Sequence, residues 1–377
     1  MNPQDLIGPS SPLGNPAPFW FITTFKVLGF ILHMIPMNIW YAGMVLVAIF
    51  GTFGKGNSEL LANRLGKSMP IIVAIGVNLG IVPLLFTQVG YYQFYYPAGV
   101  LIGWAWFSVI ILLLVAYYGV YAYSLSVRKQ RRTRFAMTSA WVSSILFIII
   151  GFLFANNFSL MVNVDNWIGI FNRTNVAGAP TGIALNTSDP TLFPRWLMMF
   201  GIAIMTTAVY ITVDAAFFRK EETTEEYRGW AGKFAFRFFT LGMIWFAVTG
   251  AWYIFWTLDR FTMARQNSEP LMHMILILTA VSPGLVWLAL RDQRRGVTKR
   301  AAISAAVAQF LVVTLNAITR QWVQNTEISR YRDVSKEAVN IQWSPLILFL
   351  VLFVLGLAIV GWMLSKVAEV RKSELKA

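Results

Sequence analysis

The chain has 377 residues, of which 57% are hydrophobic, 15% aromatic and 13% charged, a composition too apolar for a soluble protein of this length and typical of a polytopic membrane protein. Its net charge is +14, which basic loops beside an anionic leaflet explain, and no basic patch interleaved with aromatic residues indicates nucleic-acid binding. Cysteine is absent, which excludes disulfides, covalently attached c-type haem and thiolate-held iron–sulfur clusters from this chain.

Nine apolar runs follow a polar N-terminal segment, which carries no Lys or Arg and so lacks the basic region of a signal peptide. Each run is long enough to cross about 30 Å of hydrocarbon as a helix, and no alternating pattern indicates a β-barrel. The predicted fold is therefore all-α, a polytopic membrane protein with nine transmembrane helices. The runs cover residues 21–50, 69–92, 98–125, 136–158, 196–218, 234–258, 271–290, 301–319 and 344–364.

The runs and their connections divide the chain into six segments. Two of these are long outer loops with aromatic residues, which are candidates to cover a cofactor or to dock a periplasmic partner; ordinary connectors with interfacial aromatics are the alternative. The segments are a polar N-terminal segment (1–19), a first group of four helices (20–160), an outer loop (161–195), a second group of four helices (196–319), an outer loop (320–343), and the ninth helix with a basic cytoplasmic tail (344–377).

Lys and Arg residues concentrate in alternate connections. The run at 128–134 carries five of them, whereas none precedes the first span and none lies between the second and third spans. By the positive-inside rule the N-terminus is outside and the C-terminus is cytoplasmic. An odd number of spans likewise requires the two termini to lie on opposite sides of the membrane.

The acidic residues fall in predicted loops or tails, except Asp214, which falls near the cytoplasmic end of the fifth span. No carboxylate is predicted at mid-membrane. Proton pumps, proton-coupled transporters and oxygen-reducing sites commonly need one there to carry protons. The pattern weighs against all three classes.

His33 is one of only two histidines, and it lies about a dozen residues into the first span. At that depth polar side chains are expensive and usually functional. Pro36 has no N–H for the carbonyl of Leu32, so a bend is predicted beside His33. His33 is therefore the first candidate for a metal ligand.

His273, the second histidine, lies at the predicted outer end of the seventh span, between Met272 and Met274. Imidazole and thioether groups are the usual axial ligands of non-covalent haem, so this turn is a candidate for ligands; an interfacial histidine is the alternative. Serine or cysteine catalysis is not indicated, because no acid accompanies either histidine and cysteine is absent.

Nine spans, an outer N-terminus and a histidine in the outer half of the first span resemble subunit I of the cytochrome bd quinol oxidase family. The likeness covers most of the chain in topology, and short sequence strings support it. These are Gly76-Val77-Asn78-Leu79-Gly80 with Gln93-Phe94, similar to the family's second span; Asp189-Pro190 with Pro194-Arg195-Trp196-Leu197-Met198, similar to the start of its fifth span; and Arg320-Gln321-Trp322, similar to a reduced form of its Gly-Arg-Gln-Pro-Trp signature.

The resemblance implies roles for four residues. His33 matches the histidine that ligates the haem at the oxygen-reducing site. Met274 matches a ligand of the low-spin haem b, and His273 lies directly beside it. Met198 stands where the family has the histidine opposite that methionine, so the axial pair of a low-spin haem would be Met198 with His273 or Met274.

The chain departs from the family's pattern at its carboxylates and at its quinol loop. The glutamate that ligates the family's second high-spin haem falls near Ala317, beside Asn316, and the third-span glutamates have no counterpart at 103–107. The long quinol-binding loop is reduced to roughly Asp259–Pro270. These losses remove what a dioxygen-reducing quinol oxidase needs.

The resemblance and its departures together predict a bd-like subunit of a respiratory electron-transfer complex in the bacterial cytoplasmic membrane. Haem b and quinone are the implied cofactors. The partners are membrane lipid, other membrane subunits and a periplasmic cytochrome or other redox protein, and electrons would pass between this partner and the quinone pool. Its enzyme class would be that of an oxidoreductase subunit.

Three alternatives remain open at this stage. One is a divergent terminal oxidase subunit with unusual ligands. Another is a haem-free structural or anchoring subunit whose aromatic-rich spans pack against a catalytic partner. The third, a transporter of a neutral solute, would be supported by inverted repeats with broken helices.

Overall fold

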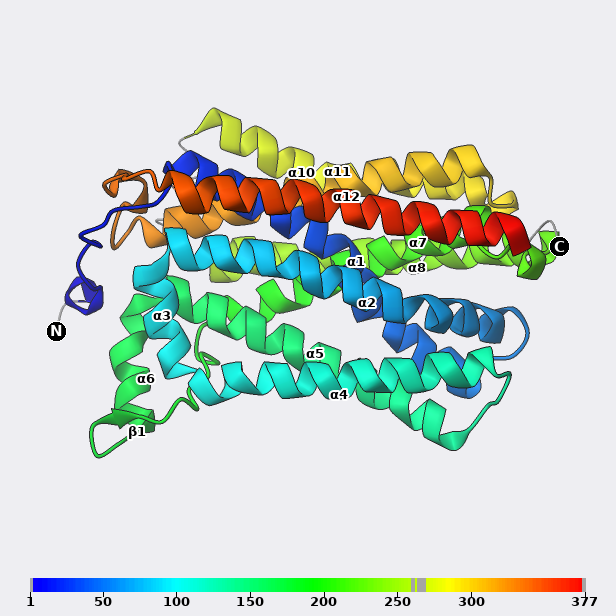
Figure 1. Ribbon diagram of the computed structural model, residues 1–377, viewed down its shortest axis with the longest axis horizontal. Helices are drawn as coiled ribbons and strands as arrows, with labels where there is room; N and C mark the ends of the chain where they lie inside the picture. The colour runs from blue at the N-terminus through cyan, green and yellow to red at the C-terminus, as the bar shows by residue number, and fades with distance from the viewer. Residues whose placement is uncertain (1–2, 259–261, 263–268, 375–377) are drawn as a thin grey trace.

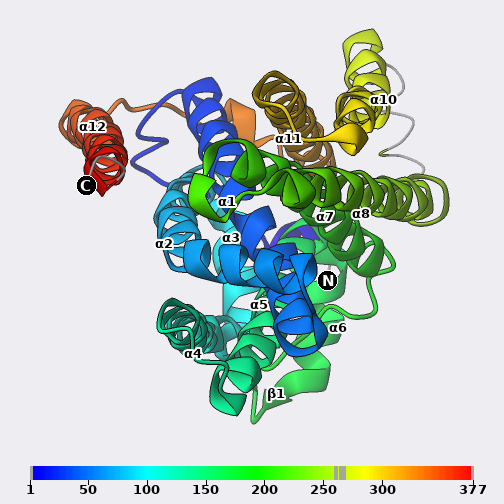
Figure 2. The same cartoon turned by 90° about the vertical axis from the view of Figure 1, so that its right-hand side faces the viewer.

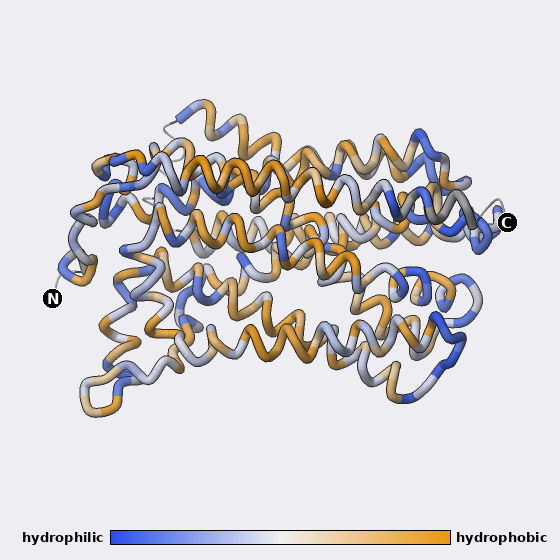
Figure 3. Tube along the Cα trace, viewed as in Figure 1, coloured by the Kyte–Doolittle hydropathy of each residue, from blue (hydrophilic) through white to orange (hydrophobic). Residues whose placement is uncertain are grey.

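The computed structural model describes residues 3–258, 262 and 269–374. In this part of the chain, nine helices are long and apolar enough to cross a membrane, and they lie side by side along the long axis of the molecule (Figure 1). Apolar residues dominate the middle of the bundle, and hydrophilic residues concentrate toward its two ends (Figure 3). The predicted all-α fold with nine transmembrane helices is confirmed, whereas the orientation of the termini stays a prediction.

The spanning helices are α1 (Phe19–Phe53), α2 (Asn57–Gly90), α4 (Gly103–Arg128), α5 (Arg134–Val162), α7 (Leu192–Phe217), α8 (Glu225–Trp252), α10 (Pro270–Asp292), α11 (Lys299–Ile328) and α12 (Trp343–Glu374). The shorter elements include the helices α3 (Tyr92–Leu101) and α6 (Trp167–Thr174), an antiparallel pair of β1 (Asn175–Val176) and β2 (Ala179–Pro180), and a π-turn, η4 (Tyr253–Thr257), that extends α8. Single helical turns complete the connections: η1 (Pro3–Leu6), η2 (Val164–Asn166), η3 (Lys220–Glu222), η5 (Gln293–Arg295) and η6 (Val334–Lys336).

Several helices extend beyond the apolar runs that predict them. α2 begins at Asn57 rather than at residue 69, and α11 continues to Ile328 rather than ending at 319. The extra turns carry charged residues such as Arg64 and Glu327, and these residues are buried in contact with other parts of the protein. A hydropathy pattern scores such residues as loop, although their charges are compensated inside the bundle.

α1 is the central helix of the bundle. It packs against α2, α5, α7 and α11, and 67% of its most apolar stretch is buried, the largest share among the spanning helices of the described chain. The view in Figure 2 shows α1 surrounded by these helices. α1 also remains helical through Pro36. A ligand held by the buried face of α1 therefore lies inside the bundle.

α12 lies at the edge of the bundle (Figure 2), and none of its most apolar stretch is buried. Its Phe349 and Phe353 contact Phe25 of α1, with ring centroids 5.5 and 5.9 Å away. The chain just before α12 also pairs with the N-terminal segment. Asn15 donates to the carbonyl of Ala338 at 2.7 Å, and further backbone bonds join 340 to 15 and 342 to 16. The contacts described here thus attach α12 through its N-terminal half and the residues that precede it.

Threonine side chains cap the first turns of three spanning helices. Thr133, Thr224 and Thr298 accept hydrogen bonds from the third backbone N–H that follows each of them, at the starts of α5, α8 and α11. Helix starts leave backbone N–H groups without an intrahelical acceptor, and a threonine hydroxyl satisfies one of them. The three caps mark the end of the bundle at which α2 begins and α7 ends, which is the predicted cytoplasmic side.

A buried ionic cluster joins α2 to α7 at this end of the bundle. Arg64 is fully buried, and its Nε donates to Asp214 Oδ2 at 2.5 Å. Arg219 binds the other carboxylate oxygen at 2.9 Å, and Arg64 also donates to the carbonyl of Phe218 at 2.7 Å. Buried charges are tolerated when they are paired and hydrogen-bonded. The cluster therefore fixes the position of α7 relative to α2.

A second polar contact joins α1, α7 and α11 near the middle of the bundle. Asn38 Nδ2 and Gln309 Nε2 both donate to Thr206 Oγ1, at 3.1 and 3.0 Å, and Thr207 Oγ1 donates to the carbonyl of Asn38 at 3.1 Å. All four residues are buried. Polar side chains that bond across helices hold membrane bundles together in the absence of a hydrophobic driving force.

Replacing Asp214 with Asn would leave Arg64 buried without its counter-charge, and removing one partner of a buried pair costs about 3–5 kcal/mol. We expect the Asp214→Asn protein to unfold at a clearly lower temperature than the parent in detergent. Glu59→Gln is the matched control, because Glu59 and Arg132 pair where both side chains are exposed and such pairs contribute about 0–1 kcal/mol. Equal stability of the two variants would contradict this role of the cluster.

The Thr206→Val substitution conserves shape but removes the acceptor shared by Asn38 and Gln309. Leaving buried donors without a partner costs about 1–3 kcal/mol, so thermal unfolding should occur at a lower temperature. Thr212→Val on the same helix serves as the control, because the buried Thr212 hydroxyl donates only to the carbonyl of Val209. An equal loss of stability in Thr212→Val and Thr206→Val would show that the contact among α1, α7 and α11 adds no stability beyond that of a single buried threonine hydroxyl.

Candidate cofactor site

A cavity of about 440 Å³ lies between α1, α2, α4 and α5, with residues of α7 and α11 completing its walls. His33 lies on a transmembrane helix and lines this apolar cavity, as its depth in the first apolar run predicts. His33 and Trp40 of α1 lie directly against α2, and Phe147 and Phe154 of α5 also line the cavity. The cavity is concave, apolar and supplied with a few polar groups, which is the usual character of a ligand site.

The His33 ring is fixed in one orientation and one tautomer. Its Nδ1 lies 2.7 Å from the carbonyl oxygen of Gly76. A carbonyl can only accept, so Nδ1 carries the proton and donates it, and the neutral ring keeps a lone pair on Nε2. This arrangement, with one ring nitrogen donating to a backbone carbonyl, is the one that metal-ligating histidines adopt.

Two glycines of α2 allow His33 to approach that helix so closely. A Cβ added at Gly80 would lie 2.8 Å from the Cε1 and Nδ1 atoms of His33, and one added at Gly76 would lie 2.1 Å from the Trp40 ring. Trp40 in turn meets the His33 ring edge to face, with centroids 5.9 Å apart. Only glycine leaves the space that this contact between α1 and α2 requires.

Two cations, the buried Lys26 and the half-buried Arg320, lie at the end of the cavity that is predicted to be the outer one. Lys26 donates to Gln324 Oε1 at 2.9 Å and stands 4.3 Å above the Tyr91 ring. The guanidinium of Arg320 lies 4.6 Å from the centre of the Phe30 ring. All residues that line the cavity are described, and none of them is Asp or Glu. Since buried cations without a counter-charge are costly, the cavity is suited to an anionic or electron-rich group.

Sequence reasoning missed Lys26 and treated Arg320 as part of an outer loop. Lys26 is a single charge inside an otherwise apolar run, and this was the signal that could have identified it. Arg320 lies on α11, two turns before Glu327, which pairs with Arg195 of α7. Arg195 also donates to the Tyr253 hydroxyl at 2.8 Å. Charged residues therefore extend from the cavity to the end of the bundle that is predicted to be the outer one.

Ala317 lines the cavity, at the position where the resemblance to bd oxidases would place a ligating glutamate. A methyl group cannot ligate iron or carry a proton. The structure thus presents His33 as the one imidazole of the cavity and provides no carboxylate among the residues that line it.

The other predicted ligands lie outside this cavity. His273 and Met274 are exposed, the latter by 52%, and they stand on α10, which packs on α8 and α11. Met198 packs instead against the apolar cluster of Tyr253, Leu258 and Val323. Figure 1 shows the outer end of α10 turned away from the other helices. None of these three side chains lines the His33 cavity, so their pairing on a low-spin haem stays a prediction.

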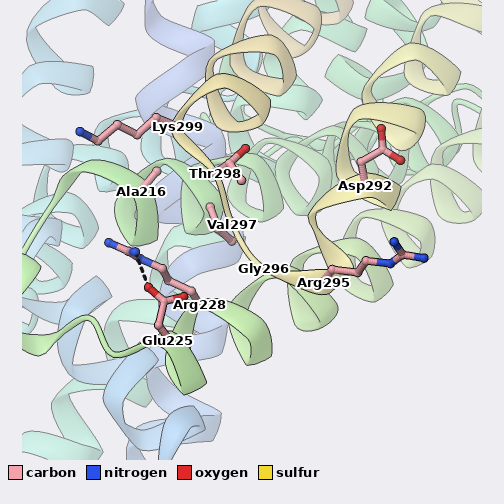
Figure 4. Close-up of a pocket in the computed structure, with 9 residues that line it drawn as sticks. All are labelled: Ala216, Glu225, Arg228, Asp292, Arg295, Gly296, Val297, Thr298 and Lys299. Carbon is pink, nitrogen blue, oxygen red and sulfur yellow. Dashed lines mark hydrogen bonds and ion pairs between the residues drawn. The ribbon is translucent and has the colours of Figure 1, made fainter.

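A further pocket of about 480 Å³ lies at the opposite end of the bundle, where α7, α8, α10 and α11 meet (Figure 4). Arg228 is paired with Glu225 at 2.7 Å, and the side chain of Arg295 points away from those of Arg228 and Lys299 in Figure 4. They do not converge on one point, and no histidine lines this pocket. The His33 cavity is therefore the candidate site.

Comparisons with known proteins support the fold. No protein-family model and no curated protein matches this sequence. The solved structure of bd oxidase from Geobacillus thermodenitrificans is similar, with a TM-score of 0.69 over 93% of this chain and 98% of that chain, at 12% sequence identity. The protein is thus a multi-pass helical membrane protein with a bd-oxidase-like fold.

The Gly80→Ala substitution would place a methyl group 2.8 Å from the imidazole of His33, so the ring would have to move away from the Gly76 carbonyl. Overpacking of this kind costs about 1–3 kcal/mol, and we expect a matching fall in the unfolding temperature. Gly284→Ala is the control, because a Cβ at Gly284 of α10 meets nothing within 4 Å. If both variants were as stable as the parent, this would contradict the close contact between Gly80 and the His33 ring.

Proposed function

We propose that this protein is a haem-binding subunit of a respiratory complex in the bacterial cytoplasmic membrane, and that it passes electrons between the quinone pool and a periplasmic or membrane-bound redox partner. The observation that carries the proposal is the geometry of His33. A neutral imidazole, tied through Nδ1 to the Gly76 carbonyl, lines a cavity inside a bd-oxidase-like bundle.

The residues of the cavity fit a haem. Nε2 of His33 has the lone pair that an axial ligand needs. Lys26 and Arg320 supply the positive charge that the propionates of a haem b would neutralise. Gly80 and Gly151 line the cavity beside aromatic residues, and small residues and flat rings suit a planar ligand. A bound haem supplies one-electron redox chemistry at such a site.

The chain's own residues would hold this cofactor and exclude water from it. Phe147, Phe154 and Trp40 present apolar surface to the cavity, and a low dielectric strengthens the attraction between the outer cations and an anionic ligand. None of the groups that line the cavity is a carboxylate. Reduction of dioxygen consumes protons, so this lining favours electron transfer over a terminal oxidase reaction.

The His33→Ala substitution should abolish haem binding at the cavity. We expect the purified complex to show Soret and α-band absorption, and its pyridine haemochrome to give less haem per chain in His33→Ala than in the parent. The His273→Ala variant tests the second predicted site separately, since a further loss there would assign a second haem near Met274 and Met198.

A substitution far from the cavity serves as the control. Glu59→Gln changes an exposed pair at the far end of the bundle and should retain the haem content of the parent. A colourless purified complex, or a His33→Ala protein with unchanged haem content, would overturn the proposal. The bd-like bundle would then be an anchoring subunit.

A further inference from the structure

A methionine that the family resemblance does not select lines the His33 cavity. Met199 of α7 is half-buried and belongs to the lining of this cavity, whereas Met198, the residue before it, does not. Imidazole and thioether groups are common axial ligands of haems that transfer electrons. The cavity therefore contains an imidazole from α1 and a thioether from α7.

Met198 and Met199 point in different directions from α7. A Cβ added at Gly250 of α8 would lie 3.6 Å from the Met198 sulfur, so Met198 faces α8. Successive residues of an α-helix are turned by about 100°, and this turn brings Met199 round to the cavity. Only the second of the two adjacent methionines is thus placed to act together with His33.

Met199 and His33 lie at nearly the same depth in the bundle. α1 and α7 both run toward the end at which α2 begins, and Asn38 of α1 donates to Thr206 of α7 at 3.1 Å. His33 lies five residues before Asn38, and Met199 lies seven residues before Thr206. At 1.5 Å per residue, the levels of His33 and Met199 along the bundle differ by only about 3 Å.

The two side chains belong to different sides of the cavity. His33 lies against α2, where its Nδ1 is bonded to the Gly76 carbonyl at 2.7 Å. α2 and α7 both pack against α1, which lies between them in Figure 2. Axial ligands bind iron from opposite faces of a porphyrin, and side chains from two sides of a cavity can do this.

The other side chains of the lining that carry a suitable electron pair are Lys26, Met37 and Tyr41. The amine of Lys26 donates to an amide oxygen of α11 at 2.9 Å, and the hydroxyl of Tyr41 accepts from an indole N–H of α7 at 2.9 Å. Met37 lies one turn after His33 on the same face of α1, so a porphyrin between the two would meet the backbone of that helix. Met199 is the remaining partner for His33.

We propose that the thioether of Met199 is the second axial ligand of the haem that His33 holds, which makes the iron six-coordinate and low-spin. This inference rests on the proposed haem-binding function. It differs from the pair that the family resemblance implies, Met198 with His273 or Met274, because both ligands belong to one cavity. Iron ligated on both faces has no open position for dioxygen, and a thioether ligand raises its reduction potential.

Absorption, magnetic circular dichroism and electron paramagnetic resonance spectra of the purified complex test this ligation. The His33→Ala spectrum is subtracted from each, so that a haem bound elsewhere does not contribute. For the parent we expect a low-spin signal, the near-infrared band of thioether-ligated ferric haem, and no change when carbon monoxide is added to the reduced protein. The Met199→Leu protein should lose that band, become high-spin, bind carbon monoxide and have a lower midpoint potential.

Two further methionines provide matched controls. Met37→Leu removes the other thioether of the cavity, and Met198→Leu removes the neighbouring thioether that faces α8. Both proteins should retain the spectrum of the parent. A high-spin parent, a Met199→Leu spectrum identical to that of the parent, or the same spectral loss in either control would overturn the proposal.

Histidine substitutions decide the question if Met199→Leu loses its haem or fails to fold. Met199→His should give the low-spin spectrum of bis-imidazole ligation, because the new ring would stand where the thioether was. Met198→His should retain the spectrum of the parent, because position 198 faces α8. Bis-imidazole ligation in Met198→His, or in neither protein, would overturn the role of Met199.

Haem content measured on the same samples separates this inference from the proposed function. The pyridine haemochrome reports the amount of haem whatever its axial ligands are. Haem that depends on His33 but whose spectrum is the same in all the methionine variants would overturn ligation by Met199 and leave haem binding at His33 in place. A complex without haem would overturn both.

Discussion

The hydrogen bond from His33 to the Gly76 carbonyl is the constraint on which the arrangement of the site depends. It can form only because α1 and α2 approach each other over glycines, with Gly80 against the imidazole and Gly76 against the Trp40 ring. The bond fixes the tautomer, and the close packing fixes the ring. A single contact between two helices thus determines both where the histidine stands and which nitrogen is free to bind.

Cations at the two ends of the bundle pair with carboxylates, whereas the lining of the cavity contains cations and no acid. At the end where α2 begins, the buried cation Arg64 has the carboxylate of Asp214, and at the other end Arg195 has Glu327. In the cavity, Lys26 and Arg320 have aromatic rings and an amide for neighbours, and the lining contains no acid. The cavity thus combines two cations with a lining that contains no acid, and this gives it the character of a binding site for an anionic ligand.

Much of the fold could be read from hydropathy, because nine long apolar runs can satisfy their backbone groups only as helices. His33 could be selected by the same reasoning, from a polar residue deep in a span. The details that hydropathy could not supply are those set by tertiary contacts. The burial of Lys26 and the helical continuation through Arg320 to Glu327 depend on partners from distant parts of the chain. The positions of Met198 and His273 likewise depend on how α7 and α10 diverge, which spacing along the sequence does not encode.

The pairing between the N-terminal segment and the residues that lead into α12 has a consequence for biogenesis. Asn15 finds its backbone partners at Ala338 and Asn340, more than three hundred residues later in synthesis. If the N-terminus is outside, this strand-like contact closes only after the eighth helix has been inserted and the following loop translocated. The N-terminal segment is therefore without these backbone partners until the chain has been synthesised as far as the residues that lead into α12.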